Sequence, residues 1–154
     1  MNNCPYSILS IDLGATSGIA VYDEGDIVFT EEYKITCLSD IEETILPLIK
    51  KYNVKLIIVP YPTRIYWVIV KQSQQMGVVK LVAEKNNISV VESNDKHCKK
   101  NVSGSGAIKK EHIKEIYPAY PSEHVRDAVM FIDSYLIDCS YVRLRPQHQD
   151  LKHS

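Results

Sequence analysis

The sequence has no long hydrophobic run, no paired-cysteine motif and no excess of charge of one sign. Its longest apolar run, near position 66, is too short to span a bilayer, and Lys71 interrupts it. The four cysteines are scattered without a Cys-x-x-Cys pair, which argues for reduced thiols and against a zinc site or a disulfide framework. The N-terminus lacks the basic and apolar segments of a signal peptide. These absences predict a cytoplasmic protein that does not enter a membrane.

What the sequence does contain is the composition of an ordinary globular domain. Of its 154 residues, 45% are hydrophobic and 24% are charged, which is enough for a sizeable core. We find no internal repeat, linker or low-complexity segment. The sequence therefore predicts one domain over residues 1–140, followed by a polar tail over residues 141–154.

The net charge of −1 conceals an uneven distribution of charge. Residues 1–62 carry nine acids and four bases, whereas residues 96–114 carry six lysines and a single glutamate. A local basic patch on a nearly neutral chain is what a phosphate-binding face requires. Lysine-rich surfaces are also common on solvated helices. From charge alone, a solvent-exposed surface without a binding role is therefore the alternative.

The hydrophobic pattern predicts an α/β domain with a mixed sheet. Three strands of an antiparallel meander and two further strands are expected over residues 8–13, 18–22, 27–33, 55–59 and 88–92. Helices are expected from residue 39 onward and over residues 63–86, 95–101, 108–117 and 122–139.

Three residues give specific predictions for the ends of these helices. Ser39 begins a Ser-x-x-Glu capping box, so the first helix should start there. Pro47 should kink or end the same helix, because proline removes a backbone hydrogen bond. Ser122 should cap the last helix.

Asp12 lies at the end of the first expected strand, directly before a glycine turn, in the stretch DLGATSG over residues 12–18. A buried carboxylate is costly unless it is paired or binds a metal. The stretch has three interpretations: a structural turn, a metal-binding carboxylate with Gly14 and Gly18 letting a ligand approach the backbone, or the phosphate-binding hairpin of sugar-kinase and actin-like ATPases. The ATPases need two large lobes, and this chain has room for one.

The last expected helix carries a histidine and an aspartate at the edge of its apolar face. His124 and Asp127 are three residues apart and therefore lie side by side on a helix. The residues that define the apolar face are Val125, Ala128, Val129, Ile132, Tyr135 and Leu136. A surface pair of this kind is common, as is a turn such as Gly104-Ser105-Gly106, so neither feature is specific alone.

The order of these features resembles the RuvC family of Holliday-junction resolvases, which have the RNase H-like fold. The first strand carries an aspartate, a lysine-flanked Gly-x-Gly loop lies near residue 104, and a late helix carries His and Asp. The resemblance spans residues 8–137, and the most similar segments are residues 72–83 with Gly77, 96–110 and 122–128.

One position departs from the family. Its second carboxylate is a glutamate that ends the strand equivalent to residues 55–59, and here that position is Pro60, which has no metal-binding side chain. Three other acids are nearby in the sequence but at different positions of the motif: Glu84, Glu92 and Asp95.

The resemblance implies two-metal phosphodiester hydrolysis with Mg²⁺ or Mn²⁺, and a histidine ligand favours Mn²⁺. Asp12 would bridge the ions, Asp127 would hold one, and His124 would bind metal or orient the attacking water. Lys110 completes the expected catalytic set by contacting phosphate or stabilising developing charge. The residues expected to contact nucleic acid are Lys96, Lys99, Lys100, Lys109, Lys110, Arg64 and Tyr61. Tyr61, Tyr66 and Trp67 would stack on unpaired bases, or these aromatic residues belong to the core.

The function that the resemblance implies is a metal-dependent endonuclease acting on branched DNA, with the four-way junction as its substrate. A homodimer is expected, because two strands of a two-fold symmetric junction must be cut. Two alternatives remain: a catalytically impaired junction-binding protein of the same fold, and an RNase H-like nuclease acting on RNA.

Overall fold

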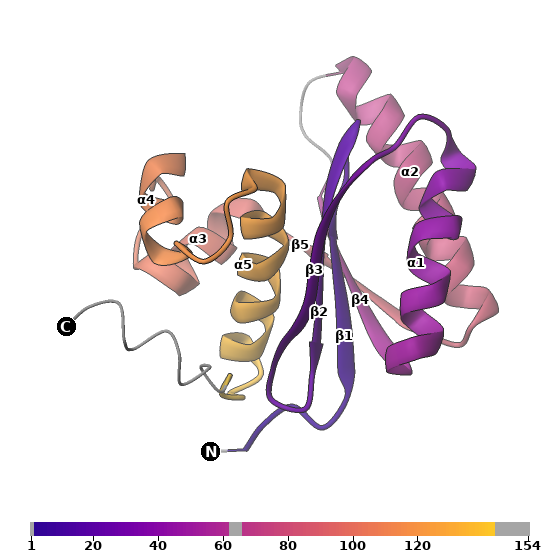
Figure 1. Cartoon of the computed structure of the whole chain (residues 1–154). Coiled ribbons are helices and arrows are strands. Elements are labelled where there is room, and N and C mark those ends of the chain that lie inside the picture. Colours follow the sequence, from indigo (N-terminus) through magenta and orange to yellow (C-terminus); the bar gives the residue numbers. More distant parts are fainter. Residues whose placement is uncertain (1, 62–65, 144–154) are drawn as a thin grey trace.

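Five strands form one mixed sheet in the order β3-β2-β1-β4-β5 in the computed structural model, which describes residues 2–61 and 66–143 (Figure 1). The strands are β1 (Ser7–Asp12), β2 (Thr16–Asp23), β3 (Asp26–Lys34), β4 (Val54–Pro60) and β5 (Ser89–Ser93). The first three form an antiparallel meander, and β4 and β5 run parallel to β1. The predicted α/β class with a mixed sheet is confirmed.

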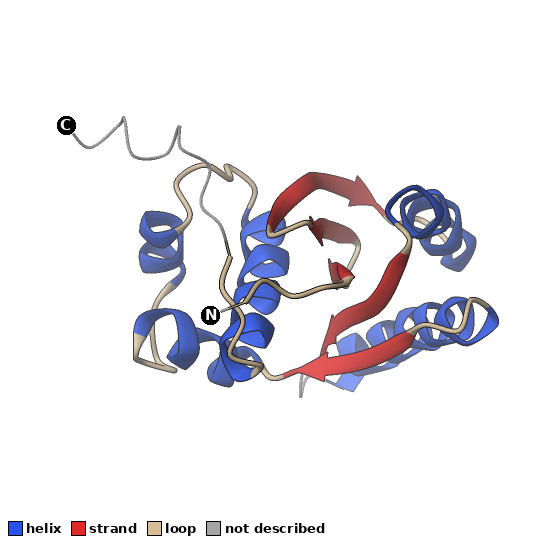
Figure 2. Ribbon diagram, turned by 90° about the horizontal axis from the view of Figure 1, so that it is seen from below, coloured by secondary structure: helices blue, strands red, loops and turns tan. Residues whose placement is uncertain are grey.

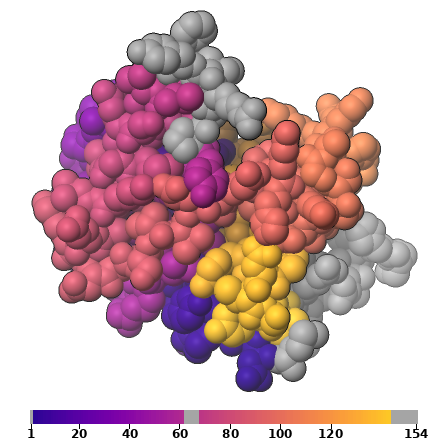
Figure 3. Space-filling model, turned by 180° about the vertical axis from the view of Figure 1, so that it is seen from behind, coloured from indigo at the N-terminus to yellow at the C-terminus, as the bar shows by residue number. Residues whose placement is uncertain are grey.

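Helices cover both faces of this sheet, and the sheet curls between the two helical layers (Figures 1 and 2). The helices are α1 (Leu38–Tyr52), α2 (Tyr66–Lys85), α3 (Asp95–Ser103), α4 (Lys110–Ile116) and α5 (Glu123–Asp138). The first two cover one face, and the other three lie on the opposite side. Figure 3 shows this from behind, with α2 in pink on one side and the orange region of α3 and α4 on the other. None of these described helices is long and apolar enough to cross a membrane.

The alternation of side chains along the strands divides the core into two layers. Leu9 and Ile11 of β1 belong to the layer under α1 and α2, whereas Ile8 belongs to the layer under α5, and all three are fully buried. By the same alternation, Asp12 at the end of β1 lies on the α5 side of the sheet. The position of this carboxylate follows directly from the two-residue period of its strand.

The start of α1 differs from the prediction. Its N-cap is Cys37 rather than Ser39. The reason is Asp40, whose carboxylate accepts hydrogen bonds from the backbone N–H groups of Thr36 at 2.9 Å and Cys37 at 3.1 Å. Asp40 therefore stabilises the first turn in the way that a capping-box glutamate would, two residues earlier than expected.

Pro47 does not end α1, which continues to Tyr52. The residues on both sides of the proline are held by burial against the sheet, since Ile45 is fully buried and Ile49 is 5% exposed. Their packing outweighs the lost backbone hydrogen bond, so the prediction of an early end is wrong.

The described part of the predicted tail is anchored to the domain. The Arg143 guanidinium pairs with Asp133 of α5 at 2.8 Å and with Asp26 at 3.1 Å, and Val142 donates to the carbonyl of Asn2 at 3.3 Å. Residues 144–154 and Arg64 lie outside the described residues, as do the side chains of Tyr66 and Trp67. The division into a domain and a polar tail stays a prediction.

Candidate active site

Asp12 and His124 meet where the end of β1 lies under the first turn of α5. The His124 Nδ1 atom is 3.2 Å from an Asp12 carboxylate oxygen, and the Asp12 side chain is 16% exposed. The turn starts here because the Ser122 hydroxyl accepts a hydrogen bond from the Val125 N–H at 3.3 Å, as the sequence predicts. Two residues 112 positions apart in the sequence are thereby in contact.

Gly18 is what allows this contact. It pairs with Asp12 across the β1–β2 ladder, and a Cβ atom on it would lie 2.1 Å from the backbone carbonyl carbon and oxygen of His124. No side chain fits at that distance, so the first turn of α5 rests directly on the backbone of β2. The sequence predicted that Gly18 lets a ligand approach the backbone, whereas in the structure α5 fills that space.

Asp127 follows one turn later on α5 and lines a pocket of about 110 Å³ between α3, α4 and α5. The other residues that line it are Asp95, Lys99, Lys110, Ile113, Glu123 and Arg126. The structure thus places Lys99 and Lys110 of the predicted set at the same pocket as Asp127, which is one helical turn from His124.

The loop around Gly104 brings the two lysines together. α3 ends at Gly104, which has a left-handed φ of +85°, and the chain then turns back into α4 with Lys110 as its first residue. The predicted Gly-x-Gly loop therefore has a structural role, which is to place Lys99 and Lys110 at one pocket.

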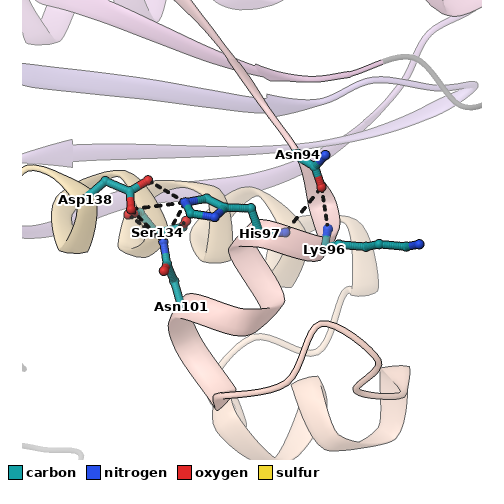
Figure 4. A network of polar contacts seen from close by, with 6 residues as sticks. All are labelled: Asn94, Lys96, His97, Asn101, Ser134 and Asp138. Carbon is teal, nitrogen blue, oxygen red and sulfur yellow. Dashed lines mark hydrogen bonds and ion pairs between the residues drawn. The ribbon is translucent and has the colours of Figure 1, made fainter.

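A polar network fixes α3 on α5, and Figure 4 shows its members side by side. The His97 Nε2 atom is 2.9 Å from the Asp138 carboxylate, and the Asn101 amide donates to the Ser134 hydroxyl at 2.8 Å. Asn94 caps α3 through the N–H groups of residues 96 and 97. These contacts determine where α3 presents its lysines.

Of the other predicted nucleic-acid residues, Arg64 lies outside the described residues, and the remaining four are exposed. Lys96 and Lys100 are exposed on α3, and Lys109 is the exposed N-cap of α4. Tyr61, directly after β4, is 55% exposed and donates its backbone N–H to Ser93 at 2.9 Å. An exposed ring is available for stacking, so Tyr61 is not a core residue.

Two carboxylates at the pocket were not in the predicted site. Asp95 pairs with Lys99 at 2.7 Å along α3, and Glu123 contacts Lys110 from the next helix. The first pair has an i,i+4 signal in the sequence. The second joins α4 to α5, and no sequence spacing indicates it.

Burial and mutual repulsion shift the pKa values of the two central aspartates. Burial raises the pKa of Asp12, and the hydrogen bond from His124 opposes this shift. The same hydrogen bond raises the pKa of His124. Burial and the neighbouring carboxylates of Asp12, Asp95 and Glu123 raise the pKa of Asp127 to about 7, which Lys99 partly offsets.

The side chains of the site include the types of ligand that bind a divalent metal ion. Asp12 and Asp127 supply carboxylate oxygens and His124 an imidazole nitrogen, which is compatible with Mn²⁺ or Mg²⁺. The carboxylates repel each other, and a cation between them would relieve that repulsion. As they stand, no three His, Cys, Asp or Glu side chains within residues 2–61 and 66–143 converge closely enough to ligate an ion.

Pro60 lies where a further ligand would be needed. Leu56 and Ile58 of β4 pack under α5, so the two-residue alternation puts Pro60 on that face as well. Ser10 pairs with Ile58 in the parallel β1–β4 ladder, so Pro60 and Asp12 stand side by side at the same edge. Glu92 does not substitute for it, since Glu92 pairs with Lys80 of α2 at 2.7 Å.

We expect affinity for Mn²⁺ to increase as the pH rises from 6 to 8. The raised pKa of about 7 means that Asp127 is largely protonated at pH 6. The raised pKa of His124 means that its ring keeps its proton to a higher pH than an ordinary histidine does. A metal ion has to displace both protons. Calorimetric titration with Mn²⁺ at pH 6, 7 and 8 measures the effect, and Asp127→Asn should flatten the dependence. Equal affinity at all three pH values would contradict it.

The comparisons with known proteins were made on the sequence and on the fold. The sequence matches the family model described as crossover junction endodeoxyribonuclease RuvC over residues 1–118, which end before α5. Comparison with curated proteins gives no match.

Several solved structures share the fold. Thermus thermophilus RuvC in complex with a Holliday junction substrate has a TM-score of 0.76 at 17% identity, covering 87% of this chain and 94% of that one. Thermus thermophilus RuvC alone has a TM-score of 0.71 at 15% identity, with 87% and 95% covered. The fowlpox virus resolvase with Holliday junction DNA has a TM-score of 0.60 at 15% identity, with 86% and 98% covered. The fold is RNase H-like, and the chain belongs to the RuvC family.

Proposed function

We propose that this protein is a metal-dependent nuclease that cuts branched DNA, with the four-way junction as its substrate. The observation that supports this most is the contact of Asp12 with His124, one helical turn from Asp127 and its pocket with two lysines, in a chain of the RuvC family. Two of the similar structures were determined with Holliday junction DNA. Hydrolysis of a phosphodiester by this chemistry requires carboxylates that bind metal ions and positively charged side chains that bind phosphate. This chain has both kinds of residue at the site.

Asp12, Asp127 and His124 would hold the divalent ion. When bound, the ion supplies positive charge to the reacting phosphate and lowers the pKa of a coordinated water. His124 leaves its hydrogen bond with Asp12 to do so, which is possible because its side chain is 40% exposed. Lys110 and Lys99 lie at the pocket beside these residues, where ammonium groups bind phosphate oxygens and stabilise charge that develops on them.

A catalytically impaired junction-binding protein is the second candidate. Pro60 supplies no ligand. In the described residues, no three His, Cys, Asp or Glu side chains are placed closely enough to ligate one metal ion. Asp12 and Asp127 bring two negative charges, fewer than two divalent ions require, so binding of metal without DNA should be poor.

One experiment separates these functions. A labelled four-way junction and an RNA–DNA hybrid are each incubated with the protein in Mg²⁺, in Mn²⁺ and in EDTA. Cutting of the junction supports the nuclease, and metal-independent binding without cutting supports the impaired protein. Cutting of RNA but not of the junction would support an RNase H-like activity instead.

Pro60→Glu should restore a third carboxylate beside Asp12. It should raise the affinity for Mn²⁺ and, if the wild type cuts only in Mn²⁺, allow cutting in Mg²⁺. In Pro60→Gln the new side chain is as long as glutamate but carries no charge. This variant therefore controls for the loss of the backbone restriction that proline imposes. A folded Pro60→Glu protein that equals Pro60→Gln in metal affinity and rate would refute this. A wild type already fully active in Mg²⁺ would instead point to Asp95, which lines the pocket with Asp127.

The exposed face of α2 supports a homodimer. Val70 is 43% exposed and Leu81 is 48% exposed, and with Gln74 and Gly77 they follow one face of the helix. Two large exposed apolar side chains on one helix face are a candidate contact for a second copy of the chain. We expect sedimentation velocity to show a dimer and Leu81→Glu to shift it toward the monomer. A wild type that sediments as a monomer at all concentrations would contradict the proposal.

A further inference from the structure

Every cationic side chain that lines the pocket beside Asp127 is already engaged. Lys99 pairs with Asp95 at 2.7 Å, and Lys110 pairs with Glu123. The Arg126 guanidinium donates to the backbone carbonyls of Tyr120 at 2.9 Å and Pro121 at 2.8 Å. The pocket thus holds three cations and three carboxylates, and an incoming phosphate has to compete with partners that these cations already have.

The two lysine pairs differ in how easily they can be exchanged. Lys99 and Asp95 lie one turn apart on the same helix, and the Lys99 side chain is only 20% exposed. Lys110 and Glu123 come from α4 and α5, and their side chains are 73% and 42% exposed. An exposed ion pair between two flexible side chains is weak. The Lys110–Glu123 pair is therefore the easier of the two to exchange for a pair with phosphate.

We propose that Glu123 occupies, in the free protein, the place of a DNA phosphate on Lys110 and competes with DNA for this lysine. A carboxylate and a phosphodiester offer the same kind of anionic acceptor to an ammonium group. Glu123 therefore weakens junction binding and acts as a positioning residue that keeps Lys110 directed at the pocket until DNA arrives. The inference rests on the proposed function, because it requires that DNA binds at this pocket.

The first measurement compares two acids near Lys110. Glu123→Gln frees the lysine, whereas Glu111→Gln removes an exposed acid of α4 that does not line the pocket. Binding of a fluorescent four-way junction is titrated in EDTA, so that no strand is cut. Glu123→Gln should tighten binding about two- to fivefold, the value of one exposed ion pair, and more than Glu111→Gln does. Thermal unfolding establishes that both variants are folded.

A double-mutant cycle then tests the pairing itself. In a Lys110→Ala background, Glu123→Gln should tighten binding no more than Glu111→Gln does, because no lysine is left to be freed. A general change in surface charge would give the same gain with or without Lys110. Equal effects of the two glutamine variants, or a gain that persists without Lys110, would overturn the inference while leaving the proposed function intact. If neither wild type nor Glu123→Gln binds the junction, the proposed function fails and the inference with it.

Discussion

An Asp12→Asn protein should bind the four-way junction as tightly as the wild type, or more tightly, and should cut it at least about a hundredfold more slowly. Asparagine keeps the shape of the side chain at the end of β1 but removes the charge that a divalent ion requires. It also removes a negative charge from the site proposed to bind phosphate, so affinity for DNA should not fall. Cleavage is measured in Mn²⁺ and binding in EDTA, on the same junction.

The same variant has a readout that does not depend on cleavage. The Asp12 carboxylate raises the pKa of His124 and is one of the charges that raise the pKa of Asp127. In Asp12→Asn both pKa values should therefore move back toward their ordinary ranges, which NMR titration of the His124 ring can follow. Wild-type cleavage by Asp12→Asn, with an unchanged His124 titration, would mean that Asp12 is only a turn residue.

Gly18→Ala should displace the start of α5 and disrupt the site without changing any chemically active group. The added Cβ would lie 2.1 Å from the backbone of His124 and 2.4 Å from the Val125 nitrogen. Backbone atoms cannot rotate away, so α5 has to move, at a cost of about 1–3 kcal/mol or more in the free energy of unfolding. Denaturant unfolding measures this loss, and cleavage should fall further than the folded fraction does.

Gly77→Ala is the matched control for this variant. A Cβ on Gly77 meets no atom within 4 Å, and alanine in a helix is favoured over glycine by about 0.5–1 kcal/mol. Gly77→Ala should therefore be as stable as the wild type or more so. Because Gly77 is on the face proposed for dimerisation, the proteins are compared in the same association state. A Gly18→Ala protein with wild-type stability and activity would show that α5 is not seated on Gly18.

Local patterns in the sequence were sufficient to predict the elements that carry this site. The apolar strand and the glycine turn after it placed Asp12 at a strand end, and Ser122 marked the start of α5. The three-residue spacing of His124 and Asp127 put both on one side of that helix. These features are determined by residues close together in the sequence, and for that reason they could be predicted.

The parts that could not be predicted depend on contacts between distant elements. The pairing of Lys110 with Glu123 arises only once α4 is folded against α5. Pro47 was expected to kink or end α1; the helix does not end there, because burial of Ile45 and Ile49 outweighs that local preference. The position of Asp95 at the same pocket as Asp127 follows from the packing of α3 on α5, through contacts such as Asn101 with Ser134.

The contact between Asp12 and His124 also has a consequence for biosynthesis. The aspartate leaves the ribosome well before its partner, which is synthesised 112 residues later. All five strands precede α5 in the chain, so a nascent chain can form the sheet while Asp12 still has no histidine beside it. Closing so long a loop is slow compared with forming local structure. The contact between Asp12 and His124 is therefore expected to form last, and a chain whose translation stops before α5 would leave the α5 side of the sheet without its cover.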